Sequence, residues 1–180
     1  MNELDNFTQM PQALDAERAV LSCIFIDSSL LFAVSQELAP NDFFDRRNEF
    51  IFEAMVENNK NGVVNDLTTI IQYFEDRNPN VNNLLDYIAS LVSLSYSTRN
   101  IDSYIRLILD NSTKRKLINS LGTIIDSGYN KETNVIECLE SLEKATFELT
   151  SRKKSKDFAD ISNIIIDVNK SIEMHQKQDG

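Results

Sequence analysis

The chain has 180 residues, of which 42% are hydrophobic and 8% aromatic, and its formal net charge is −10. This length suits one domain with an appendage, and the apolar fraction is large enough to build a core. Because phosphate backbones repel an acidic surface, the composition disfavours direct binding of DNA by the bulk of the chain.

Few residues interrupt the apolar segments, which predicts an all-α protein. The four glycines and three prolines fall mostly between these segments, and this pattern favours helices over a turn-rich β fold. Residues 1–10 are expected to be a disordered polar tail. After it, residues 11–97 are expected to form a compact, globular helical head.

The first helix of the head is predicted from Asp15, which can cap it, to Val34. Its apolar residues cover nearly the whole helix circumference over residues 21–26. Such a pattern is typical of a central helix that is buried on all sides. We therefore expect this helix to be the centre of the head.

Three more helices complete the predicted head. They run over residues 46–59, from Asp66 through Phe74, and over residues 82–94. Asp66 is placed to cap the second of these helices, and a polar cluster ending at Gly62 closes the first. Four helices of this kind can pack as a compact bundle.

Residues 98–150 are expected to form a long antiparallel helical hairpin. Apolar residues follow helical spacing over residues 98–127, which predicts one long helix. Gly128 is placed to end that helix in the left-handed conformation. Asn134 and Glu137 have the spacing of a capping box at the start of the second helix.

The hairpin has more apolar residues than two helices can cover for each other, so it must pack on something else. Packing on the head and pairing with a second copy explain the spacing equally well, and both interpretations stay open. If a second copy is the partner, eight residues form the interface, and the last four repeat as in a coiled coil. They are Ile101, Tyr104, Ile108, Leu121, Val135, Leu139, Leu142 and Leu149.

The last part of the chain, residues 151–180, is predicted to be a charged linker followed by a separate linker helix. The cationic run at residues 152–156 is interpreted as a solvated linker, because no aromatic platform for stacking bases accompanies it. In the helix one stripe is apolar and the opposite side is polar, so the helix needs a partner to receive it. The stripe comprises Ile161, Ile164, Ile165, Val168 and Ile172.

The sequence lacks the motifs of a catalytic or metal site. A phosphate-binding loop requires G-x-x-x-x-G-K-[ST], and none of the four glycines has that spacing. The single histidine, His175, has no cysteine or histidine neighbours for a zinc site. Asp42 and Asp45 are the nearest candidates for an acid–base pair, but they stand where helix caps are expected. We therefore expect a non-catalytic chain without a cofactor or metal of its own.

The two cysteines, Cys23 and Cys138, lie in separate apolar segments, as reduced core residues of a cytoplasmic protein do. No segment approaches the roughly 18 consecutive apolar residues that a membrane span needs. The acidic, polar start of the chain does not fit a signal peptide. A cytoplasmic protein is therefore expected.

Short motifs follow one another in a characteristic order along most of the chain. They are Pro11, Ala16-Glu17, Val20-Leu21, Asp42-Phe43-Phe44, Ile51-Phe52, Asp66-Leu67 with Thr69, Tyr87-Ile88, Leu91, Ser97, Asn100, Tyr104, Ala145 and Phe147. In this order and spacing, the chain resembles the N-terminal region of DnaB-type replicative DNA helicases. It departs from the usual family pattern at Ser22, Phe44, Arg47, Asn48 and Asn82-Asn83. With the frequent Asn, Ile and Lys, these departures suggest a divergent member of the family from an AT-rich bacterium, phage or plasmid.

The resemblance implies that hairpins pair into dimers and that three dimers form the collar of a hexamer. It also implies that the linker helix docks on the motor domain of the neighbouring subunit. The implied partners are the C-terminal domain of primase and a helicase loader, while ATP and magnesium would belong to a motor domain outside this chain. The alternative is a free-standing helical adaptor, a helicase loader or inhibitor without a motor.

Overall fold

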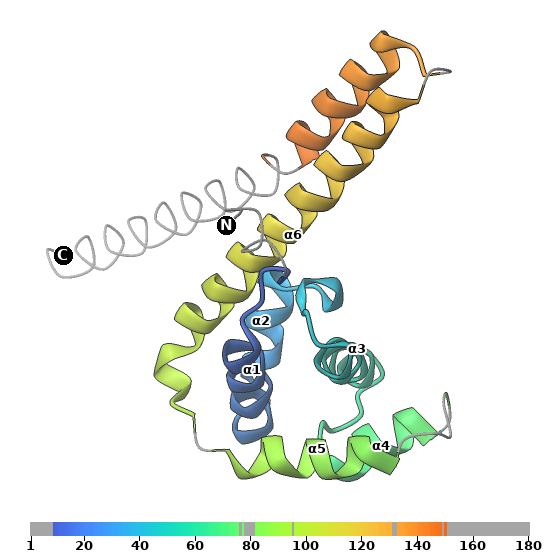
Figure 1. The fold of residues 1–180 in the computed structure, drawn as a ribbon. Coiled ribbons are helices and arrows are strands. Elements are labelled where there is room, and N and C mark those ends of the chain that lie inside the picture. Colours follow the sequence, from blue (N-terminus) through green and yellow to red (C-terminus); the bar gives the residue numbers. More distant parts are fainter. Residues whose placement is uncertain are drawn as a thin grey trace, which may run out of the picture. The chain divides into compact units, whose positions relative to one another are not determined.

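The computed structural model describes residues 9–75, 77, 82–94, 96–130, 133–148 and 150. Within these ranges every regular element is a helix, which confirms the predicted all-α class (Figure 1). Two compact units are present, residues 1–115 and residues 116–180. The predicted linker and linker helix lie outside the described residues, as do the following predicted site residues: Leu149, Ile161, Ile164, Ile165, Val168 and Ile172.

The first predicted helix is divided into two, α1 (Leu14–Ile26) and α2 (Leu30–Glu37). Asp27 ends α1 in an extended conformation. Its carboxylate accepts hydrogen bonds from the backbone N–H and the hydroxyl of Ser29, at 3.0 and 2.6 Å. A turn of this type gives the backbone local partners outside a helix. The prediction of one continuous helix to Val34 is therefore wrong.

α1 is nonetheless the central helix of the first unit, as its apolar pattern predicts. Its residues from Ala16 to Ile24 are buried, except the half-buried Arg18. α1 packs against α3 (Arg46–Lys60) and α5 (Asn82–Ser93). The α5 contact includes a hydrogen bond from the Ser22 hydroxyl to the carbonyl of Leu91.

The remaining helices of the first unit follow the predicted order. α4 (Leu67–Glu75) lies between α3 and α5 in sequence and packs against both. Figure 1 shows α4 and α5 lying across the lower end of α1, with α3, seen nearly end-on, above them. Two short 3-10 helices, Pro40–Asp42 and Thr98–Asn100, precede α3 and α6 (Ile101–Tyr129).

Two of the predicted helix caps are confirmed. The Asp66 carboxylate accepts a hydrogen bond from the backbone N–H of Thr69 at 2.8 Å, at the start of α4. Asn134 accepts one from the backbone N–H of Ile136 at 3.1 Å, at the start of the helix over residues 135–148. Each bond satisfies a donor that the first helical turn leaves unpaired.

Two other predicted caps are wrong. Asp15 lies inside the first turn of α1, whose N-cap is Ala13 without a side-chain hydrogen bond. Gly128 lies inside α6, because the backbone N–H of Asn130 still donates to the carbonyl of Asp126. Among the described glycines, the left-handed conformation is instead adopted by Gly62, with φ = +70°, just after α3.

The core of the first unit draws on all of these helices and on the beginning of α6. Fully buried side chains include Leu21, Ile24, Leu31, Ile51, Phe52, Met55, Ile70, Ile88 and Leu91. From α6, Ile105 and Ile108 join this core at 3% and 1% exposure. Their burial carries the first unit to residue 115, beyond the predicted end of the head at residue 97.

Candidate functional site

A buried carboxylate, Glu17, organises the polar interior of the first unit. Its side chain accepts hydrogen bonds from the backbone N–H groups of Phe44 and Asp45 at 2.7 and 3.2 Å, and from the amide of Asn48 at 2.9 Å. These donors lie at the start of α3, where unpaired N–H groups and the helix dipole favour a negative charge. The residue is only 1% exposed, so this set of donors compensates for the loss of its hydration.

Asn48 extends this network to α5. It is fully buried, and its side-chain oxygen accepts a hydrogen bond from the Tyr87 hydroxyl at 2.6 Å. The guanidinium of Arg47 lies 3.9 Å from the centre of the Tyr87 ring. The polar chain from α1 through α3 to α5 therefore fixes the relative positions of three helices.

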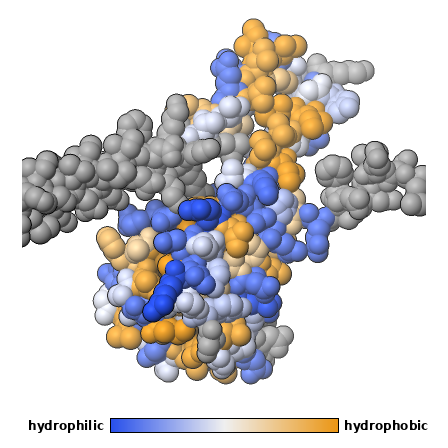
Figure 2. Space-filling model, turned by 90° about the vertical axis from the view of Figure 1, so that its left-hand side faces the viewer, coloured by the Kyte–Doolittle hydropathy of each residue, from blue (hydrophilic) through white to orange (hydrophobic). Residues whose placement is uncertain are grey.

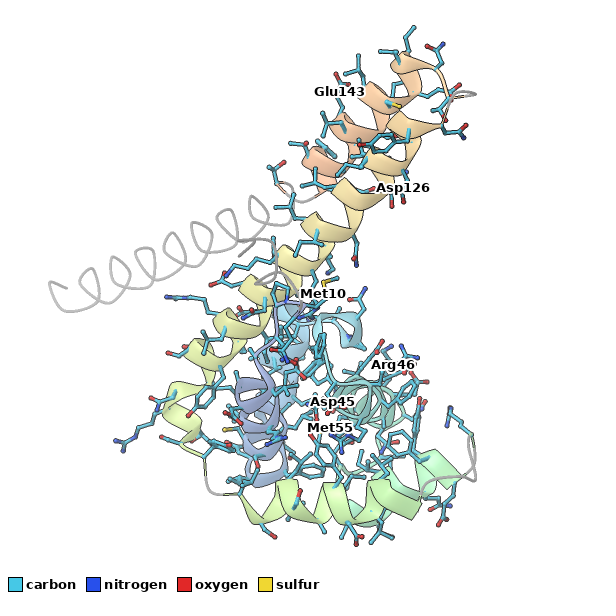
Figure 3. The ribbon with its side chains drawn as sticks, in the orientation of Figure 1. Met10, Asp45, Arg46, Met55, Asp126 and Glu143 are labelled. Atoms are coloured by element: carbon cyan, nitrogen blue, oxygen red, sulfur yellow. The ribbon has the colours of Figure 1, made fainter. Side chains whose placement is uncertain are left out.

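Asp45 caps α3 and also binds Arg47. It accepts a hydrogen bond from the backbone N–H of Arg47 at 2.9 Å, and its other oxygen lies 2.6 Å from that guanidinium. The hydrogen bond from the Arg47 side chain holds the pKa of Asp45 below its usual value. Asp45 and Arg46, both labelled in Figure 3, mark the start of this helix.

A second buried carboxylate, Asp42, ties α6 to the segment before α3. It accepts hydrogen bonds from the backbone N–H of Ala39 at 2.9 Å and from the Ser112 hydroxyl at 2.6 Å. The Arg115 guanidinium donates to the carbonyl of Asp42, and to that of Pro11 at 2.8 Å. Burial lowers the pKa of Arg115.

These networks are structural, because their polar atoms are directed at one another and at helix ends. The capping roles predicted for Asp42 and Asp45 are confirmed. Among the described residues, no three histidine, cysteine, aspartate or glutamate side chains are grouped as metal ligands would be. The role of Glu17 was not predicted. The signal in the sequence was the position of Glu17 near Ala16 and Ala19, which are both buried in the structure, because a charged side chain in a buried stretch must find polar partners.

The second unit presents a different kind of surface. The end of α6 and the helix over residues 135–148 run antiparallel, as the predicted hairpin does (Figure 1; Asp126 and Glu143 mark the two helices in Figure 3). Ten large apolar side chains of these helices are between 40% and 85% exposed, and seven of them lie on one face. This hairpin face consists of Ile118, Leu121, Ile125, Tyr129, Val135, Leu139 and Leu142.

The seven residues share one side of the hairpin. Ile124 on α6, and Cys138 and Ala145 on the second helix, are half-buried, which indicates that the two helices face each other along these residues. Each residue turns an α-helix by about 100°, so the exposed stripe of each helix is rotated away from this line in the same direction about the axis of its own helix. Antiparallel helices with the same offset present their stripes on the same face. Figure 2 shows apolar residues forming a band along this unit.

The structure separates the predicted interface residues into two groups. Leu121, Val135, Leu139 and Leu142 lie on the exposed hairpin face. Ile101 and Tyr104 are half-buried against the core of the first unit. Ile108 belongs to that core, so it is not available to a second copy, and its placement at an intermolecular interface needs correction.

No helix among the described parts of the chain combines the length and the apolar character required to cross a bilayer.

Comparison with known proteins agrees with these features. Residues 9–110 match the family described as "DnaB-like helicase N terminal domain". The chain is 29% identical over 182 residues to the replicative DNA helicase DnaB of Geobacillus stearothermophilus, and 29% identical over 186 residues to the replicative DNA helicase DnaC of Bacillus subtilis. Both alignments cover 100% of this chain and 40% of the relative. The chain therefore spans about 40% of the length of these curated relatives.

Two solved structures share the fold. The N-terminal domain of DnaB helicase from Mycobacterium tuberculosis aligns with a TM-score of 0.65 and 21% identity, covering 79% of this chain and 99% of that one. The N-terminal domain of DnaB helicase from Helicobacter pylori, described together with its interactions with primase, aligns with a TM-score of 0.57 and 25% identity. That alignment covers 72% of this chain and 100% of the other.

Proposed function

Because the chain belongs to the family of DnaB-like helicase N-terminal domains, we propose that it is a non-catalytic module for assembly and partner binding in a replicative DNA helicase. The hairpin face is the observation that carries this proposal. Seven exposed apolar side chains on one face are more than scattered surface hydrophobics, and a contiguous patch of this kind marks an interaction site.

In the proposed assembly, the hairpin faces of two copies pack together, and three such dimers form the collar of a hexamer. Full burial of an aliphatic or aromatic side chain stabilises by roughly 1.5–3 kcal/mol, and these side chains are already partly covered. Seven such side chains from each copy, a little over half exposed on average, would together contribute on the order of 10–20 kcal/mol, a range that overlaps the estimated 4–15 kcal/mol that association costs in lost freedom. The isolated module should therefore form a weak, reversible dimer, and further contacts from the rest of the helicase would stabilise the hexamer.

The proposed external partner is the C-terminal domain of primase, bound largely through the hairpin. Support comes from the Helicobacter pylori relative, the structure of which is described together with its interactions with primase. A helicase loader is a further proposed partner. DNA is not a proposed ligand of this chain, because its net charge of −10 opposes binding to phosphates.

The energy source of the proposed helicase would lie outside this chain. The relatives are about two and a half times as long as the aligned region, since the alignments cover 40% of them. ATP and magnesium would belong to a motor domain in that further sequence, and the stripe from Ile161 to Ile172 would dock on the motor of the neighbouring subunit. The proposed setting is the bacterial cytoplasm, or that of a cell carrying a phage or plasmid.

A titration with the primase C-terminal domain tests the partner proposal. Fluorescence anisotropy of the labelled primase domain should rise saturably as the chain is added. Leu139→Glu, on the hairpin face, should weaken binding at least tenfold. Lys144→Gln changes the charge by the same amount on the opposite side of that helix, so it should leave binding unchanged. No binding by the unaltered chain, or equal loss in both variants, would count against the proposal.

A further inference from the structure

The hairpin face has the form of a seat for one more helix. Its two apolar stripes, one on α6 and one on the helix over residues 135–148, flank the line along which the helices meet. An amphipathic helix laid along that line would contact both stripes and complete a three-helix bundle.

The chain carries a segment with the matching pattern. Apolar residues from Ile161 to Ile172 recur at the spacing of one helical face and span eleven residue steps. The α6 stripe from Ile118 to Tyr129 also spans eleven steps. At about 1.5 Å per residue, each stripe is roughly 16 Å long if helical. The two patterns therefore match in period and in length.

The connection between the hairpin and this segment is long enough. Ten residues, 151–160, separate the last described residue, Thr150, from Ile161. Extended, they reach about 33 Å, whereas a helix over residues 135–148 is only about 21 Å long. The segment can thus return along the whole hairpin from which it emerges.

Charge favours the same occupant. The helix over residues 135–148 carries four glutamates against a single lysine, Lys144. The ten connecting residues 151–160 carry four cations, Arg152, Lys153, Lys154 and Lys156, against two aspartates, Asp157 and Asp160. Opposite charges on adjoining segments of one chain attract each other at short range.

We propose that residues 161–172 dock on the hairpin face of their own chain and compete there with a second copy. The competition rests on the proposed function, since it assumes that the same face pairs two copies. A short flexible tether gives the segment an effective concentration in the millimolar range, whereas a second copy is present at micromolar concentration. The segment thus holds the hairpin in a closed state until another surface takes up its apolar stripe.

The closed state weakens dimerisation by a calculable factor. Both copies must release their segments, so the apparent dissociation constant rises by the inverse square of the open fraction. With about a third of the molecules open, the dimer is weakened about tenfold. Ile164→Asp with Val168→Asp should remove this effect without touching the described core.

Paramagnetic relaxation in the full chain tests the docking directly. A spin label is attached at Glu143→Cys, beside the hairpin face, in a Cys138→Ser background; the remaining Cys23 is fully buried. At about 50 µM, where most of the chain is expected to be monomeric, the amide signals of residues 161–172 should broaden. The Ile164→Asp, Val168→Asp variant should lose that broadening. A label at Lys144→Cys, on the opposite side of the helix, should broaden these signals less.

Two results would overturn the proposal. One is unbroadened signals with the label at residue 143. The other is broadening that survives when labelled chains carry no isotope and the isotope-enriched chains carry no label, because the contact would then be between copies. Light scattering on the same samples keeps the two proposals apart. Broadening within one chain with no dimer in any variant would refute the assembly proposal while supporting the docking.

Discussion

Glu17→Gln tests whether the buried carboxylate organises the first unit. The two oxygens of Glu17 accept from three donors: Phe44 N–H on one, and Asp45 N–H and the Asn48 amide on the other. A glutamine replaces one oxygen with an NH₂ group, so in either orientation at least one buried donor loses its acceptor. One unsatisfied buried donor costs about 1–3 kcal/mol, and the bonds that remain lose their charge assistance.

The expected loss in the free energy of unfolding is about 2–4 kcal/mol. At roughly 4–8 °C per kcal/mol for a unit of about this size, the melting temperature should fall by more than about 8 °C. Urea unfolding followed by circular dichroism measures the loss. Glu53→Gln, exposed on α3, removes the same charge and should cost less than about 0.5 kcal/mol. Equal, small losses for both variants would refute the role assigned to Glu17.

Three further predictions use the same measurements. Leu142→Glu should leave the helical circular dichroism intact because the side chain is 41% exposed, whereas Ile108→Glu, at 1%, should unfold the first unit; similar effects of the two would contradict the assignment of core and face. The pKa of Asp45 is lower in the folded state than in the unfolded state, where it is near 3.8. The stabilisation that ionised Asp45 gives the folded state is therefore fully present above the unfolded pKa, and it is lost as the pH falls through the lower folded pKa. The stability difference between the chain and Asp45→Asn should therefore shrink only at acid pH, and a difference independent of pH would refute the ion pair with Arg47. Asp66→Ala should lower the free energy of unfolding by about 0.5–2 kcal/mol, whereas Asp66→Asn, whose side chain can also cap a helix, should lower it much less. Equal losses in the two variants would argue against the cap.

The fold was predictable where local signals decide the structure. Asp66 and Asn134 could be recognised as caps, because a short polar side chain before an apolar run satisfies helical N–H groups whatever surrounds it. The break after Asp27 was missed because an apolar run continues on both sides of it. Only the turn that the Asp27 carboxylate forms with Ser29 separates the two helices.

Features that depend on distant partners were harder to predict. An apolar stripe reports that a helix face is buried, but not against what, so Ile108 was assigned to an interface although it belongs to the core. Glu17 is bonded to donors 27 to 31 residues away in sequence, and spacing alone does not bring them together. The seam at Val135, Leu139 and Leu142 was predicted from its repeat; the structure shows these side chains exposed, and their role at an interface stays a prediction.

The most direct test of the central claim is the mass of the chain in solution as a function of concentration, measured by light scattering. The account predicts a reversible rise from one copy toward two, strongest in the Ile164→Asp, Val168→Asp chain. Leu139→Glu should abolish this rise, and Lys144→Gln should preserve it. A mass of one copy at every concentration, in the unaltered chain and in the segment variant alike, would contradict the hairpin face as the site of assembly.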